Sequence, residues 1–119
     1  RRKLAENYTY GLTNLNIIMP QEPPYSKHTF QSFQIRIDGI QKSTRDNLIG
    51  WLLEQGIVSR RGVMACHLEP LYKCLIPGNL PNTEKAYRES LLLPLFPGMT
   101  ELQQEYVVEK LKTGIKKFS

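Results

Sequence analysis

The sequence predicts an α+β domain with a small three-stranded sheet and helices packed against one face of it. First, Phe33, Ile35 and Ile37 are separated by polar residues, as in a strand with one buried face. Second, stretches with apolar residues at helical spacing flank this strand. Third, the other apolar strand candidates, at residues 57–59 and 91–93, are short. Short strands with helices segregated around them are typical of this fold class.

The elements are expected in a simple order along the chain. Residues 1–12 predict a first helix, because Leu4, Ala5, Tyr8 and Leu12 share one face. The other expected elements are a strand at 30–38, a helix from Ser43 or Thr44 to residue 55, a strand at 57–59, a helix at 80–89, a strand at 91–93 and a C-terminal helix with a Thr100–Gln103 capping box. The predicted inner faces of the two longer helices are Leu48, Ile49, Leu52 and Leu53, and Leu102, Tyr106, Leu111, Ile115 and Phe118.

The composition is that of one small, basic domain. The 119 residues suffice for a single modest core, and the net charge of +5 permits an anionic partner. The polar side of the central strand carries Gln34, Arg36 and Asp38 instead of stacked aromatic residues, which disfavours nucleic acid. No apolar run reaches the roughly 18 to 20 residues of a membrane span and no export signal is evident, so a cytoplasmic domain without membrane contacts is expected. Cys66 and Cys74 are expected to be free thiols.

The segment at residues 56–76 is the most distinctive part of the sequence. Arg60 and Arg61 lie between a short β-branched run and Gly62. Ten of the fourteen residues at 63–76 are Val, Met, Ala, Cys, Leu, Tyr or Ile. A solvated loop is normally polar, because its backbone needs water. We therefore interpret residues 63–76 as a contact surface that is pressed against another part of a larger assembly.

Four residues are candidates for binding a ligand, and each has a structural alternative. Arg60 and Arg61 alternate faces if the strand continues through them, so one can reach a phosphate or carboxylate while the other pairs with a surface acid. His67 either comes near Arg61 and a bound anion or hydroxyl group, or is a histidine with a backbone partner. Gln31 either caps the sheet edge or reaches into a site. The spacing of histidines and cysteines favours neither a metal site nor a catalytic nucleophile.

Five motifs, taken in order, resemble the C-terminal small domain of the DegT-type nucleotide-sugar aminotransferases, which depend on pyridoxal phosphate (PLP). They are RRKLAENY, HTFQSFQIRID, GIVSRRGVMACHLEPLY, LPNTEKA and SLLLPLFPGMTELQQEYV. The ordered set spans nearly the whole chain. The resemblance also implies that the parent enzyme has the fold of aspartate aminotransferase.

The resemblance implies a parent enzyme in which a larger N-terminal domain holds PLP on a lysine. A keto nucleotide sugar receives an amino group, usually from glutamate, and PLP serves as the electron sink. The small domain closes over the site, and the enzyme is a homodimer. Residues 1–119 are then a single domain, the C-terminal fragment of a longer chain whose large domain is missing, which agrees with the lack of an initial methionine.

By position in the motifs, the resemblance implies that Arg61 and His67 line the substrate entrance, with Arg60 and Gln31 behind them. It assigns no catalytic, cofactor-binding or metal-binding residue to this chain, because none of its lysines lies in a context like the Schiff-base motif. We therefore expect the isolated chain to bind no PLP, to be inactive and to self-associate through its exposed apolar segment. A competing hypothesis is a stand-alone module that has the same fold and binds nucleotides or nucleic acid without catalysis.

Overall fold

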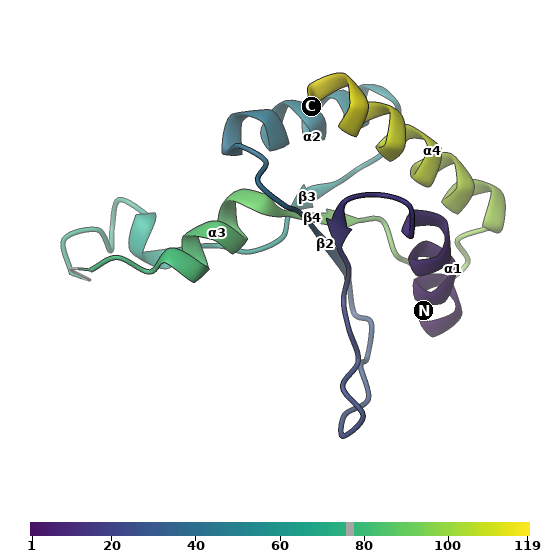
Figure 1. The fold of residues 1–119 in the computed structure, drawn as a ribbon, viewed down its shortest axis with the longest axis horizontal. Coiled ribbons are helices and arrows are strands. Elements are labelled where there is room, and N and C mark those ends of the chain that lie inside the picture. The colour runs from purple at the N-terminus through teal and green to yellow at the C-terminus, as the bar shows by residue number, and fades with distance from the viewer. Residues whose placement is uncertain (76–77) are drawn as a thin grey trace.

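The computed structural model describes residues 1–75 and 78–119 (Figure 1). Its helices are α1 (Arg2–Leu12), α2 (Lys42–Glu54), α3 (Pro81–Glu89) and α4 (Glu101–Phe118), with a short 3-10 helix, η1, at Cys66–Leu68. Its strands are β1 (Ile17–Ile18), β2 (Phe33–Ile37), β3 (Arg60–Arg61) and β4 (Ser90–Leu93). The predicted mixture of helices with a small sheet is confirmed.

The sheet has four strands, so the prediction of three strands is wrong. The strand order is β1-β2-β4-β3, and each neighbouring pair is antiparallel. The strand that the sequence did not reveal is β1, in which Ile17 faces Ile37 and Ile18 faces Arg36. Two residues cannot show an alternating pattern, and only the pairing with β2 makes them a strand.

The sequence predicts that the next strand starts at residues 57–59, whereas β3 comprises only the two arginines that follow. Its ladder consists of Arg60 opposite Leu92 and Arg61 opposite Leu91. Continued backwards, the same register would place Val58 opposite Pro94, which has no N–H group to donate to a ladder. The two arginines therefore form the edge strand.

The core lies between the sheet and the helices α1, α2 and α4, which cover one of its faces (Figure 1). Strand β2 contributes its buried row, Phe33, Ile35 and Ile37, as the alternation predicted. The helices contribute Ala5, Tyr8, Leu12, Leu48, Leu52, Val107, Val108 and Leu111. Removal of this apolar surface from water is the main stabilising term of such a core. The Tyr8 hydroxyl donates to the Pro94 carbonyl oxygen at 2.7 Å, so this buried polar group is satisfied.

The caps and buried faces of the helices agree only in part with those predicted from the sequence. The Thr100–Gln103 capping box is confirmed, because each side chain bonds the other residue's backbone N–H, at 2.9 and 3.2 Å. The predicted cap at Ser43 or Thr44 is wrong, because α2 begins at Lys42, with Gln41 as its N-cap. Leu53 and Leu102 are exposed, so their assignment to inner faces is also wrong.

Two segments extend away from the packed layers (Figure 1). Residues 19–32 form a long loop between β1 and β2. Residues 62–75 form an arm that extends, together with α3, from another side of the sheet. No helix within residues 1–75 and 78–119 has the length and apolar character needed to cross a membrane.

Candidate functional site

An open groove of about 630 Å³, here called the arginine groove, lies where β3 and the start of the arm meet α2 and α3. Its lining residues are Asp46, Ile49, Arg60, Arg61, Val63, Met64, Glu69 and Tyr87. The structure therefore brings two of the four predicted site residues into one depression. The groove combines apolar walls with charged groups of both signs, as a site for a polar ligand requires.

Arg60 and Arg61 are the groups in the groove that suit an anionic ligand. Both side chains are exposed. Neither forms an ion pair within residues 1–75 and 78–119, so the predicted pairing of one of them with a surface acid is not found there. A guanidinium group presents a planar set of N–H donors that matches carboxylate and phosphate oxygens. The two arginines can therefore bind such a group without first breaking an ion pair.

A third arginine, Arg45, is fully buried beneath the groove. Its guanidinium lies 2.8 Å from Asp46, which lines the groove, and it also donates to the carbonyl oxygens of Tyr87 and Ser90. These bonds tie α2 to the end of α3 and the start of β4. The sequence analysis missed Arg45, although a signal was present: it precedes Leu48 and Leu52 by three and seven residues, so it lies on the buried face of α2.

The path of the chain after β3 depends on Gly62. A Cβ atom at this position would lie 2.8 Å from the Ser90 Cβ and 2.9 Å from the Gln34 side chain, closer than real contacts allow. The absence of a side chain lets the backbone cross the sheet edge, where the next residue, Val63, donates its N–H to the Ser90 hydroxyl at 2.8 Å. Gly62 and Ser90 thus fix where the arm leaves the sheet beside the arginines.

His67 lies outside the arginine groove. It belongs to η1 and is buried, and its Nε2 atom lies 3.0 Å from the Glu84 carboxylate in α3. The hydrogen bond from His67 lowers the pKa of Glu84 below its usual value. The structure therefore gives His67 a side-chain partner, whereas the sequence left a backbone partner or a ligand as alternatives. This bond holds the middle of the arm against α3.

Gln31 is also separate from the groove. It is exposed in the bend that precedes β2, because this strand begins at Phe33 and not at residue 30 as predicted. It neither lines the arginine groove nor forms a ladder pair with β4. Of the four predicted residues, Arg60 and Arg61 lie together, and His67 and Gln31 lie apart from them.

Much of the apolar segment of the arm is exposed to solvent. Met64, Leu71 and Leu75 are 70%, 75% and 73% exposed, and Leu68 is also exposed. The predicted patch also includes Val63, which is half-buried, and Ile76, which lies outside the described residues. Cys66 and Cys74, in the same segment, are exposed free thiols.

Comparison with known proteins assigns the chain to a family. Residues 1–112 match the DegT/DnrJ/EryC1/StrS aminotransferase family. The chain belongs to this family. Among curated proteins that it matches, the pleiotropic regulatory protein of Geobacillus stearothermophilus is 37% identical over 125 residues. That alignment covers 100% of this chain and 32% of the relative.

Solved aminotransferase structures share the fold of this chain. TlmJ from Streptoalloteichus hindustanus, an aminotransferase, is 26% identical with a TM-score of 0.84, over 98% of this chain and 31% of that one. DesV from S. venezuelae, solved in complex with a ketimine intermediate, is 28% identical with a TM-score of 0.80, over 94% of this chain and 30% of that one. The chain thus spans about a third of the length of these relatives.

Proposed function

We propose that residues 1–119 form the C-terminal small domain of a PLP-dependent aminotransferase that transfers an amino group from glutamate to a keto nucleotide sugar. The observation that carries this proposal is the arginine groove, in which a member of an aminotransferase family exposes two arginines free of ion pairs within the described chain. A nucleotide sugar carries phosphate groups, and exposed guanidinium groups are suited to bind them.

PLP is assigned to the remainder of the protein and not to this domain. The lining of the arginine groove contains no lysine, so it offers no amine that could hold the PLP aldehyde. Lys85, in α3, lies 3.0 Å from Asp38 and is engaged in an ion pair. When bound in the parent enzyme, PLP supplies the electron sink for amino transfer. The groove residues do not fit PLP, so no step through the cofactor is derived from them.

The roles of the individual residues follow from their positions. We propose that Arg61 and Arg60 bind the anionic part of the substrate. His67 remains our candidate for the rim of the substrate entrance, where its bond to Glu84 would hold the arm in place. Gln31 remains a candidate because it is exposed and free to contact a substrate held against another domain.

The partners of the domain are proposed from its exposed apolar arm. We propose that Met64, Leu68, Leu71 and Leu75 are covered by the large domain or by the second subunit of a cytoplasmic homodimer. An exposed apolar cluster of this kind is typical of an interaction surface.

Substitution of Arg61 tests the proposed function. In the full-length protein that carries this chain, Arg61→Ala is expected to weaken nucleotide-sugar binding by about tenfold to a hundredfold, the loss of one charge-assisted hydrogen bond. The absorption of bound PLP should stay unchanged, because the groove does not hold the cofactor. Isothermal titration calorimetry with the nucleotide sugar and an absorption spectrum measure the two effects.

Lys112→Ala is the matched control, because it also removes one positive charge but lies in α4, which contributes no residue to the groove. It should leave substrate affinity within about twofold of the original protein, as expected for a screened surface charge. Equal affinity of the Arg61→Ala variant and the control would remove Arg61 from the binding site.

A further inference from the structure

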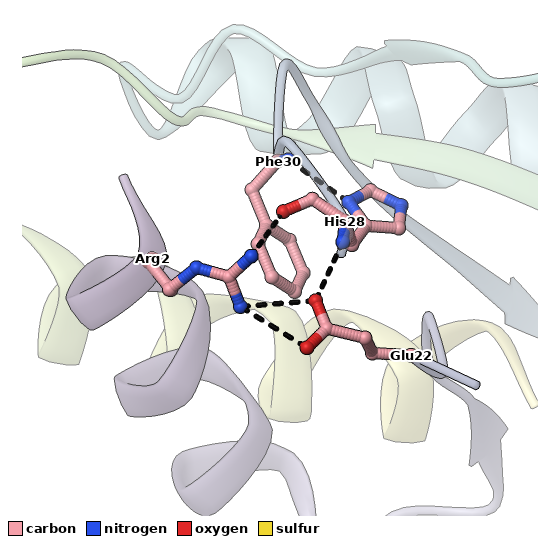
Figure 2. Close-up of polar contacts among 4 residues, drawn as sticks. All are labelled: Arg2, Glu22, His28 and Phe30. Atoms are coloured by element: carbon pink, nitrogen blue, oxygen red, sulfur yellow. Dashed lines mark hydrogen bonds and ion pairs between the residues drawn. The ribbon is translucent and has the colours of Figure 1, made fainter. Parts of the chain in front are cut away.

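The loop at residues 19–32 is fastened to α1 by a compact polar cluster (Figure 2). The Arg2 guanidinium lies 2.9 Å from the Glu22 carboxylate and donates to the His28 carbonyl oxygen at 2.6 Å. The same carboxylate accepts the His28 backbone N–H at 2.6 Å. Arg2 also lies over the Phe30 ring, 5.5 Å from its centre. Four residues from the helix and the loop thus hold one another in place.

This cluster determines which nitrogen of the His28 ring carries the proton. The Phe30 backbone N–H donates to His28 Nδ1 at 2.9 Å, so Nδ1 must be the unprotonated nitrogen. Neutral His28 therefore carries its proton on Nε2, which points away from the cluster (Figure 2). Phe30 adopts a positive φ of 47°, which non-glycine residues rarely do, so the cluster holds the loop in a specific conformation.

His28 also lines a separate pocket of about 320 Å³ at the polar face of the sheet. The other lining residues are Ile18, Met19, Pro20, Ser32, Gln34 and Arg36. The pocket shares no residue with the arginine groove. Its polar groups include His28 Nε2–H, the Ser32 hydroxyl, the Gln34 amide and the Arg36 guanidinium, so hydrogen-bond donors predominate.

Arg36 contains a donor that the described chain leaves unsatisfied. Its Nη2 atom lies 2.8 Å from the buried Glu89 carboxylate, but its Nε atom is buried and has no hydrogen-bond partner within residues 1–75 and 78–119. A buried donor without an acceptor is destabilising. An acceptor atom that enters the pocket beside Arg36 would satisfy this donor after a small movement of the side chain.

We propose that this pocket, formed by His28, Ser32, Gln34 and Arg36, binds a carboxylate or phosphate group of a small molecule. The two chemistries share the oxygen acceptors that a donor-rich pocket requires, and the Arg36 guanidinium makes its hydrogen bond charge-assisted. The site differs from that of the proposed function, because the pocket shares no lining residue with the arginine groove. Its geometry depends on the Arg2–Glu22–His28–Phe30 cluster, which keeps the His28 Nε2–H in place.

The test measures how fast diethyl pyrocarbonate modifies His28 in the full-length protein. This reagent reacts with an unprotonated imidazole nitrogen; Nδ1 is engaged by the Phe30 N–H, so reaction occurs at Nε2 after the ring exchanges tautomers, and an oxyanion that accepts from Nε2–H suppresses that exchange. Mass spectrometry of peptides reports each histidine separately. Inorganic phosphate, acetate and chloride are compared at equal ionic strength. A bound oxyanion should slow modification of His28 by about threefold when the probe is at about twice its Kd. Protection by phosphate, by acetate or by both supports the site and distinguishes the phosphate and carboxylate sources.

Variants separate pocket binding from general charge effects. Arg36→Lys keeps a positive charge for Glu89 but removes the Nε–H donor, so protection of His28 should be lost. Lys27→Gln removes an exposed charge from the same loop without changing the pocket lining, so protection should persist. Circular dichroism checks that both variants fold. Failure of both phosphate and acetate to protect His28 beyond chloride, or undiminished protection in Arg36→Lys, would overturn the proposal.

Discussion

At the scale of single residues, the path of the arm depends on the absence of a side chain at Gly62. Gly62→Ala places a Cβ 2.8 Å from Ser90 and 2.9 Å from Gln34, so one of these residues or the backbone must move. We expect a loss of about 1 to 3 kcal/mol in the free energy of unfolding, the usual cost of overpacking. Urea unfolding followed by circular dichroism measures it.

Gly50→Ala provides the matched control for this prediction. A Cβ atom at Gly50 has no neighbour within 4 Å, and the residue lies inside α2. Alanine is favoured over glycine in a helix interior, so this variant should gain up to about 1 kcal/mol in the free energy of unfolding. If Gly62→Ala were as stable as Gly50→Ala, the close approach at the sheet edge would be wrong.

Individual residues also show how much of a site can be recognised from one sequence. The adjacent arginines at positions 60 and 61 were recognisable because two charges interrupt an apolar stretch. The partner of His67 was not recognisable, because Glu84 lies seventeen residues later in the chain. Only the packing of α3 against the arm brings the two side chains together. Arg45 could have been found from its place on the apolar face of α2.

At the scale of elements, the arm exposes several large apolar side chains to solvent. Because Met64, Leu71 and Leu75 are each at least 70% exposed, the isolated 119-residue chain is expected to self-associate. Leu71→Glu should weaken this association by about tenfold or more, since burying a leucine contributes about 1.5 to 3 kcal/mol. Sedimentation velocity over a range of concentrations measures the association.

Leu53→Glu is the control for the arm, because Leu53 is 60% exposed but lies on α2. It should associate as the unchanged chain does. A chain that stays monomeric at high concentration, or equal effects of the two substitutions, would contradict the assignment of the arm as the contact surface.

Elements were predictable where a local pattern was long enough. β2 has five residues with strict alternation, and α4 has eighteen residues that begin with a capping box, so both were found. β1 and β3 have two residues each and exist only through their pairing with longer strands, which is tertiary information. Leu102 fits the apolar row of α4 by spacing, but it lies in the first turn, where the helix extends beyond the core.

At the scale of the whole molecule, the domain has a core of its own and two open candidate pockets. Helices α1, α2 and α4 enclose the core on one face of the sheet, whereas both candidate pockets are open. The chain spans about a third of the length of its relatives. The sequence could indicate the family but not the substrate, and the four binding residues stay a prediction.

The absorption spectrum of the full-length protein, purified with PLP and then mixed with glutamate, tests the central claim most directly. The account predicts a yellow band from PLP bound to a lysine of the large domain and its loss when glutamate donates its amino group. A protein that binds no PLP, or whose band does not respond to any amino donor, would contradict the assignment of this chain to a working aminotransferase.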